Sequence, residues 1–203
     1  MARNTFFSFH YERDAWRAGQ VRNCDLLATE DEHGFIDAVE WEKIEREGDA
    51  SIKRWIQSQL EGTAVTVVLI GAETAEREWV RYEILESWNR GNGVVGVRIQ
   101  NVKDVKSQTD SYGPNPFDRF KLPDASLLSS VCKVYDWVND DGRNNLGSWS
   151  QEAVEIRKKV GLPENITEIV KKVETASAGV LQAVGASRAF TPRAPWCPDH
   201  GKH

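Results

Sequence analysis

Trp79 and Glu83 are the residues whose types and spacing could carry out chemistry. They lie four positions apart in a segment with a helical pattern, and residues at that spacing lie one turn apart on the same face of a helix. A carboxylate beside an aromatic plate could stabilise an oxocarbenium-like centre, because negative charge favours the loss of a leaving group from such a centre. Spacing alone also allows a more common alternative, a packing tryptophan and a solvated glutamate.

The segment before this pair predicts where it lies. Thr63–Ile70 is a short, continuous apolar run rich in β-branched residues, which is typical of a buried strand in a parallel sheet. Gly71–Thr74 interrupts the run, and a helical pattern then extends from about Ala75 to about Arg90. Ligands of open α/β sheets bind beyond the carboxyl ends of the strands, so we expect Trp79 and Glu83 to face a crevice there.

The rest of the chain alternates strands with helices in the same way. This alternation predicts an α/β fold with a five-stranded parallel sheet and right-handed crossovers. The expected strands are residues 3–9, 34–39, 63–70, 94–99 and 131–137, and the expected helices begin at Asp14, Asp49, Ala75 and Ser148. Residues 101–124 form a long polar segment with glycine and proline, which we expect to be a functional loop at the edge or mouth of the sheet.

Composition excludes several classes of protein. The 203 residues suffice for one well-cored domain with an appended element. With 26 basic against 31 acidic residues, the net charge of −5 argues against a broad nucleic-acid footprint. The longest apolar run, residues 64–72, is too short to cross a bilayer, and the N-terminus lacks the apolar core of a signal peptide, so we expect a cytoplasmic protein that does not bind membranes.

Other chemistries have weak support in the sequence. There is no phosphate loop, no dinucleotide-binding glycine motif, no nucleophile elbow and no zinc-protease motif. Ser8 and His10 could form a nucleophile and base, but no third group is evident to orient the histidine. Cys197, His200 and His203 could in principle bind a metal, although they lie in a polar end with the composition of a flexible tail, so we expect no metal and no cofactor.

The C-terminal segment carries a second pattern. Asn165–Glu168 resembles a capping box that opens a helix, and one apolar stripe follows it at Ile166, Ile169, Val170, Val173, Val180, Leu181 and Val184. We therefore expect a domain over residues 1–160, an amphipathic helix over 161–189 and a flexible tail over 190–203. The stripe could pack on its own domain, or it could support a homo-oligomer or a partner contact.

Five segments in order are similar to the TIR-like proteins of Thoeris anti-phage defence, the ThsB family. They are Phe6–Tyr11, Val68–Gly71, Trp79–Ile84, Gly113–Phe117 and Val134–Val138, and the resemblance covers about residues 4–150. The spacing from Trp79 to Glu83 is weakly specific alone, whereas the ordered set of five segments is specific.

The resemblance implies a flavodoxin-like TIR fold. It also implies that the protein is an enzyme with NAD as its substrate, which it cleaves at the nicotinamide–ribose bond. It implies a cyclic ADP-ribose isomer as the product, a phage-derived protein trigger, and a ThsA-type effector that responds to the messenger. The family's catalytic glutamate falls on Glu83. The residues implied for substrate binding are Phe7, Ser8, His10, Tyr11, Asp37, Trp41, Gly71, Ala72 and Trp79. A non-catalytic TIR module that binds other proteins remains the alternative.

Overall fold

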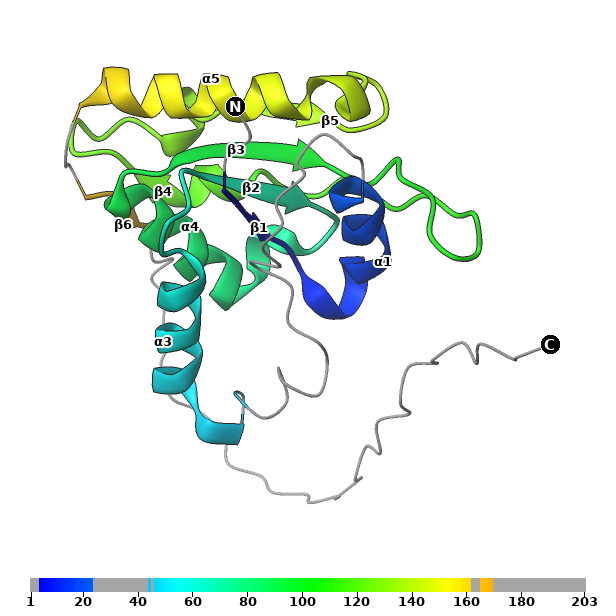
Figure 1. The fold of residues 1–203 in the computed structure, drawn as a ribbon, viewed down its shortest axis with the longest axis horizontal. Helices are drawn as coiled ribbons and strands as arrows, with labels where there is room; N and C mark the ends of the chain where they lie inside the picture. The colour runs from blue at the N-terminus through cyan, green and yellow to red at the C-terminus, as the bar shows by residue number, and fades with distance from the viewer. Residues whose placement is uncertain (1–3, 24–43, 45, 162–164, 170–203) are drawn as a thin grey trace, which may run out of the picture. The chain divides into compact units, whose positions relative to one another are not determined.

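A four-stranded parallel sheet forms the centre of the described part of the chain. The computed structural model describes residues 4–23, 44, 46–161 and 165–169 (Figure 1). The sheet consists of β1 (Thr5–Ser8), β2 (Val65–Ile70), β3 (Gly93–Arg98) and β5 (Val134–Asp136), which lie side by side in the order β1-β2-β3-β5. Every neighbouring pair is parallel, so the predicted α/β class with a parallel sheet is confirmed.

The predicted strand at residues 34–39 lies outside the described residues. The other four predicted strands are present, and β2 is buried along its whole length as its apolar run predicts. The register places Ser8 beside Val68 and Ile70 beside Arg98, so the last residues of β1, β2 and β3 end at one edge of the sheet. That edge is where an open α/β sheet binds its ligands.

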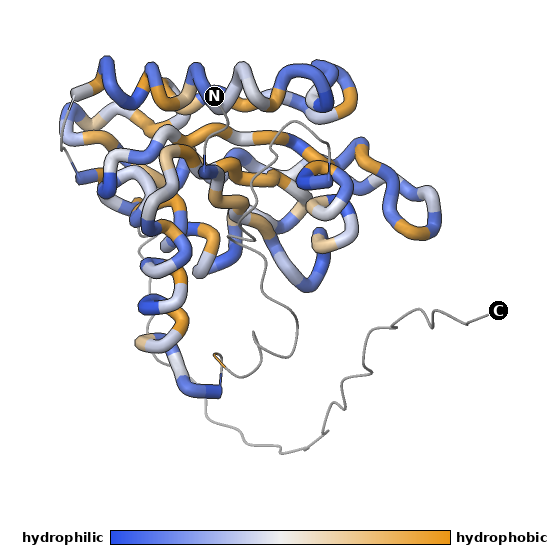
Figure 2. The backbone as a smooth tube through the Cα atoms, viewed as in Figure 1, coloured by the Kyte–Doolittle hydropathy of each residue, from blue (hydrophilic) through white to orange (hydrophobic). Residues whose placement is uncertain are grey.

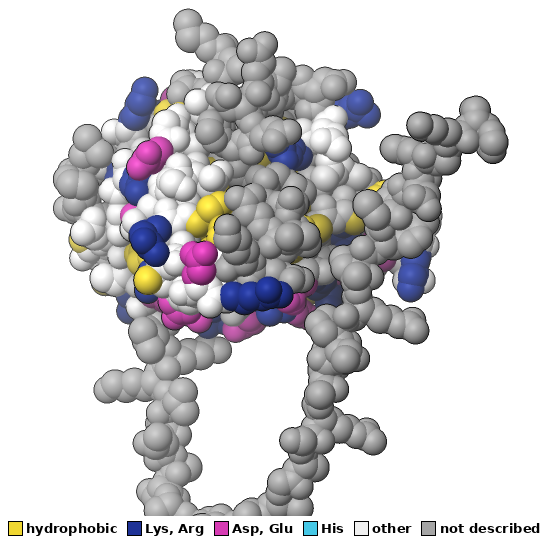
Figure 3. All heavy atoms as spheres, turned by 60° about the horizontal axis from the view of Figure 1, so that its bottom comes forward, with side chains coloured by type: hydrophobic (Ala, Val, Ile, Leu, Met, Phe, Trp, Pro, Cys, Tyr) yellow, Lys and Arg dark blue, Asp and Glu magenta, His cyan; other side chains and the backbone are white. Residues whose placement is uncertain are grey.

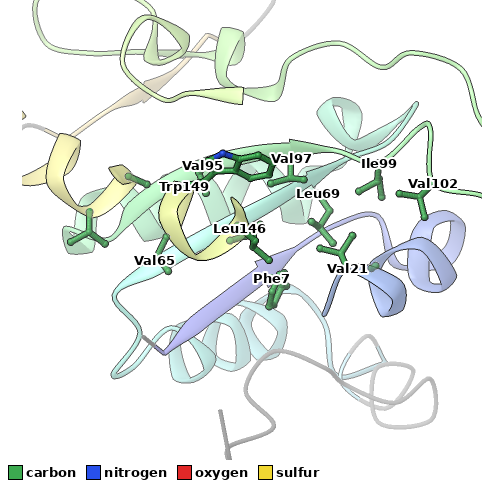
Figure 4. Packing of buried hydrophobic residues seen from close by; sticks show 14 residues of the cluster. Phe7, Val21, Val65, Leu69, Val95, Val97, Ile99, Val102, Leu146 and Trp149 are labelled. Atoms are coloured by element: carbon green, nitrogen blue, oxygen red, sulfur yellow. The ribbon is translucent and has the colours of Figure 1, made fainter. Parts of the chain in front are cut away.

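Helices cover both faces of the sheet. On one face, α1 (Tyr11–Arg22) and α5 (Gly142–Val160) enclose a core that includes Phe7, Leu69, Val97, Leu146 and Trp149 (Figure 4). On the other face, α3 (Asp49–Gln59) packs on Phe6 and α4 (Glu78–Arg90) packs on Val68 and Ile70. The hydropathy of the backbone tube follows this layering, because the strands are the most hydrophobic part and the helices alternate between the two colours (Figure 2).

The helix that carries Glu83 ends at the predicted residue but begins three residues later than Ala75, the predicted start. A short 3-10 turn at Thr74–Glu76 precedes α4, and α4 ends at Arg90. Gly91 follows with φ of 93°, a left-handed conformation that glycine adopts without steric cost. Helix α1, by contrast, begins at Tyr11, so the prediction that Asp14 caps it is wrong: Asp14 lies inside the first turn with its side chain buried.

The predicted helix at 161–189 does not begin at Asn165. Thr167–Glu168 instead form β6, which pairs in antiparallel fashion with β4 (Phe120–Lys121). Ile166 is 2% exposed in the core beneath α4, and the Ile169 amide donates to the Arg119 carbonyl at 2.7 Å. These contacts provide hydrogen bonds to the backbone in an extended conformation, so the capping-box pattern at Asn165–Glu168 does not start a helix there. Residues 170–189 and the predicted tail at 190–203 lie outside the described residues.

Short elements complete the described unit. Two further 3-10 turns lie at Pro116–Arg119 and Leu128–Ser130. Among the described residues, no helix is both long and apolar enough to cross a membrane. Basic and acidic side chains are interspersed on the face shown in Figure 3, in keeping with the nearly balanced charge of the sequence.

Candidate active site

Glu83 lies on α4 with its side chain against the end of β1. Only 8% of the residue is exposed, and the Ser8 hydroxyl donates a hydrogen bond of 2.6 Å to its Oε2. Side chains alternate along a strand, so Phe6 and Ser8 point to the face covered by α3 and α4. Ser8 is the last residue of β1, which brings this pair to the carboxyl edge of the sheet. The structure thus places Glu83 at the edge where the sequence predicts it, while its place in a crevice and its catalytic role stay predictions.

Burial makes Glu83 an unusual carboxyl group. Removal from water raises its pKa to about 8, and the hydrogen bond from Ser8 opposes that rise. The protonated form therefore predominates at neutral pH in the free protein. A cationic ligand placed beside the carboxyl would favour the ionised form, because opposite charges attract strongly where water is excluded. The site is thus suited to a substrate that carries or develops positive charge.

His10 is the second buried polar residue near this edge. It is 6% exposed, and neither ring nitrogen has a hydrogen-bond partner among the residues that the structure describes. Glu12 lies 3.7 Å from Nε2 and Glu73 lies 4.0 Å from Nδ1. Burial and then the charge of Arg77 lower the pKa of His10, although the two glutamates oppose that effect. The imidazole is therefore neutral at pH 7 and can act as either donor or acceptor to a ligand.

The turn after β2 is enclosed on two sides. The Gly71 backbone is in such close contact with Asp14 that a Cβ there would lie 2.2 Å from Asp14 Oδ2. Gly113 approaches from the long loop, and a Cβ on it would lie 2.0 Å from the Gly71 carbonyl oxygen. Only glycine allows backbones to approach so closely. We call residues 101–115 the strap, because this segment crosses the Gly71 turn.

Two arginines hold the strap in place. Arg13, on α1, donates to both carboxylate oxygens of Asp110 at 3.0 and 2.8 Å and to Glu73 at 2.9 Å. A bidentate arginine–carboxylate pair fixes both distance and orientation. Arg98, at the end of β3, donates to the Gly113 carbonyl at 2.9 Å and stacks on Tyr112. The predicted long loop is thus an ordered segment anchored to α1 and β3.

Asp14 is a buried ionisable residue beside the Gly71 turn whose position the sequence did not reveal. Its side chain is fully buried, neither oxygen accepts a hydrogen bond from the described part of the chain, and Arg17 Nη1 lies 3.6 Å from Oδ1. Burial raises the pKa of Asp14 to about 6, while the charge of Arg17 opposes the rise. In the sequence it resembles an ordinary helix cap, and no local signal distinguishes it from one. Arg13 and Asp110 were also missed, because charged residues so distant in sequence give no sign of pairing.

The structure brings together only some of the residues predicted to bind substrate. Ser8, His10, Tyr11, Gly71 and Ala72 all lie at or just beyond the carboxyl ends of β1 and β2. Phe7 does not join them: its side chain belongs to the core beneath α1 and α5 (Figure 4). Adjacent residues of a strand face opposite sides, so Ser8 points to the other face. Asp37 and Trp41 lie outside the described residues. Among the described residues, no cluster of His, Cys, Asp and Glu could hold a metal ion, and Cys197, His200 and His203 lie outside them.

Trp79 lies between core and surface. Its half-buried side chain packs on the cluster of Phe6, Ile52 and Ile56, and its ring meets Tyr82 edge to face at 6.3 Å. Trp79 therefore links α4 to α3. These contacts do not test the predicted place of Trp79 in the pocket wall, which stays a prediction.

Replacing Trp79 with alanine should lower the free energy of unfolding by about 1–3 kcal/mol, because it removes the packing of the ring on α3 and its edge-to-face contact with Tyr82 within α4. Urea unfolding measures this. Trp16 provides a matched control, since it is 57% exposed on α1, and Trp16→Ala should change stability by less than about 0.5 kcal/mol. Equal stability of the two variants, together with a raised KM for NAD in Trp79→Ala alone, would place Trp79 in the pocket wall instead.

Comparison with known proteins agrees with this geometry. Residues 6–104 match the family model described as "Thoeris protein ThsB, TIR-like domain". A protein of Bacillus cereus (strain MSX-D12) named "Putative cyclic ADP-D-ribose synthase ThsB1" is 36% identical over 190 residues, covering 73% of this chain and 99% of the relative. The chain belongs to the ThsB family. The ThsB match includes all of β1 except Thr5, together with β2, α4 and β3, and thus both members of the Ser8–Glu83 pair.

Proposed function

We propose that this chain is an enzyme of Thoeris defence that cleaves NAD and makes a cyclic ADP-ribose isomer as a messenger. The observation that carries the proposal is a buried glutamate, bonded to Ser8, at the carboxyl edge of the sheet of a ThsB protein. The name of the Bacillus cereus relative, a cyclic ADP-D-ribose synthase, supports the product class. A phage-derived trigger and a ThsA-type effector that responds to the messenger are part of the proposal.

The proposed reaction begins with loss of nicotinamide. The bond between ribose C1 and the nicotinamide nitrogen breaks, and its electron pair leaves with the nicotinamide, which becomes neutral. The ribosyl group then carries the positive charge. Ionised Glu83 stabilises that charge electrostatically, and it does so far better in a site of low water content than it would in bulk water. The nicotinamide ring of NAD is itself cationic, so binding it would also favour ionisation of Glu83.

The second step decides whether the product is a cyclic messenger or linear ADP-ribose. A cyclic product forms when a nucleophile of the ADP-ribose itself captures the cation, and linear ADP-ribose forms when water does so. Capture by a hydroxyl group releases one proton, for which the neutral imidazole of His10 is a suitable acceptor. Tyr11, Gly71, Ala72, Asp37 and Trp41 complete the proposed pocket, whose task is to fold the nucleotide back and keep water out.

The product formed from NAD tests this proposal. We expect the activated protein to release nicotinamide and a second product with the mass of NAD minus nicotinamide and no added water, as measured by mass spectrometry. Incubations with and without a phage lysate fraction distinguish triggered from constitutive activity. Only the hydrated linear product would leave NAD cleavage standing and refute messenger synthesis. No consumption of NAD under either condition would favour the protein-binding TIR module.

A further inference from the structure

The hydroxyl of Ser8 is already committed within the protein. Ser8 is fully buried, and its one donor proton points to Glu83 Oε2 at 2.6 Å, across 75 residues of sequence. A ligand-binding serine needs either a free proton or an accessible oxygen. Ser8 offers neither in this arrangement, so its predicted role as a substrate ligand does not fit its surroundings.

Glu83 depends on that hydroxyl. Among the described residues, no Lys, Arg or His lies within ion-pair distance of the Glu83 carboxyl, and Ser8 is the only side chain that donates to it. The neighbouring positions Val80 and Ile84 are buried apolar residues. An ionised carboxylate in such surroundings is costly unless a donor compensates it. The Ser8 hydroxyl therefore supplies the local stabilisation of the charged form.

The bond also fixes geometry. It uses Oε2, so the carboxyl is held at one oxygen and its plane is set by a donor on a rigid strand. The second oxygen, Oε1, then keeps one orientation relative to the edge of the sheet. A carboxylate that must stabilise charge on a ribose gains most when it is oriented before the substrate arrives.

We propose that Ser8 is a positioning residue for Glu83: its hydroxyl holds Oε2, favours the ionised carboxylate and leaves Oε1 to face the substrate. The catalytic part of this assignment rests on the proposed NAD-cleaving function. The coupling between the Ser8 and Glu83 side chains does not depend on that function. The assignment replaces the predicted role of Ser8 as a substrate ligand by a role that Ser8 exerts through Glu83.

The chain contains a matched control for this pair. Thr66 on β2 and Ser87 on α4 form another fully buried hydroxyl pair between strand and helix, with a hydrogen bond of 2.8 Å. Ser87 lies one turn beyond Glu83 on the same helix. Ser87→Ala therefore removes a similar buried contact from the same helix without touching the Glu83 carboxyl.

The pH dependence of nicotinamide release tests the assignment. In Ser8→Ala we expect kcat at pH 7 to fall by about tenfold and the rising limb of the profile to move up by about one pH unit, because the charged form loses its donor. Ser8→Thr, which keeps a hydroxyl, should restore part of the rate. Ser87→Ala should keep the wild-type profile. An unchanged profile in Ser8→Ala, or a raised KM with unchanged kcat, would overturn the assignment.

A second measurement does not need activity. Unfolding free energies of wild type, Ser8→Ala, Glu83→Gln and the double variant, taken from pH 6 to pH 9, give the pH at which Glu83 ionises in the folded protein. We expect that pH to be higher in Ser8→Ala than in wild type. An equal value would refute the coupling. If instead the coupling is present but wild type never consumes NAD, the proposed function fails and the Ser8–Glu83 assignment survives as a structural fact.

Discussion

Glu83→Gln should lower the rate of NAD cleavage by about 10²-fold or more, because it deletes the charge that stabilises the ribosyl cation and keeps the shape of the side chain. The glutamine carbonyl can still accept the hydrogen bond from Ser8, so the fold and the binding of NAD should survive. Nicotinamide release measures the rate, and titration with NAD measures binding. A loss smaller than threefold would show that Glu83 is not the catalytic carboxylate.

The same substitution should stabilise the protein. Glu83 has a folded pKa of about 8 against an ordinary value of 4.5, so the unfolded chain releases its proton at a lower pH than the folded one does. Between those values the folded state binds more protons than the unfolded state, and stability falls as the pH rises. Glu83→Gln removes that fall. Its advantage over wild type should grow by up to ~1.4 kcal/mol per pH unit and level off above about pH 8.

Other titrating groups determine the pH range in which the contribution of Glu83 to stability can be measured separately. Asp14, with a pKa of about 6 against 3.8, gives the same sign but completes its change at lower pH. His10 has a lowered pKa, so it costs stability only as the pH falls below its ordinary value of 6.5, where the unfolded imidazole becomes charged. Between pH 6.5 and pH 8, the change in the free energy of unfolding with pH therefore comes mainly from Glu83. Urea unfolding at these two pH values measures the effect. Ser87→Ala is the control: it keeps Glu83, so its stability should fall with pH as that of wild type does, and its difference from wild type should not change with pH.

The parts of the fold that sequence predicted are those set by local patterns. The continuous apolar run of β2 requires cover on both faces, and Gly91 ends α4 through its own backbone preference. From these two elements the position of Glu83 at the sheet edge follows. The Ser8–Glu83 bond does not follow, because a side-chain contact across 75 residues depends on how β1 and α4 meet.

Two of the sequence predictions are wrong because burial against distant parts of the chain outweighs a local sequence pattern. The family resemblance implies that Phe7 lines the pocket with Ser8, but adjacent residues of a strand face opposite sides, and Phe7 is buried in the core beneath α1 and α5. Asn165–Glu168 has the pattern of a helix start, but pairing with β4 and burial of Ile166 favour the extended form. In both places burial of a large apolar side chain decided the outcome, and that depends on tertiary neighbours.

Gly113→Ala should lower the free energy of unfolding by about 1–3 kcal/mol, because the new methyl group would lie 2.0 Å from the Gly71 carbonyl oxygen. A backbone atom cannot move aside as a flexible side chain can. The strap would have to rise from the Gly71 turn and weaken the contacts of Arg13 and Arg98 with it. Urea unfolding measures the stability, and trypsin cleavage after Lys103 and Lys106 measures the release of the strap.

Gly147→Ala separates the steric effect from the general effect of adding a methyl group. Gly147 lies within α5 with nothing within 4 Å of its would-be Cβ, so alanine there should stabilise the protein by about 0.5–1 kcal/mol. Opposite signs for the two variants are therefore expected. If Gly113→Ala is as stable as wild type and its strap is cut no faster, the strap does not press on the Gly71 turn. If it is destabilised but cleaves NAD at the wild-type rate, the turn at Gly71 and Ala72 does not shape the substrate pocket.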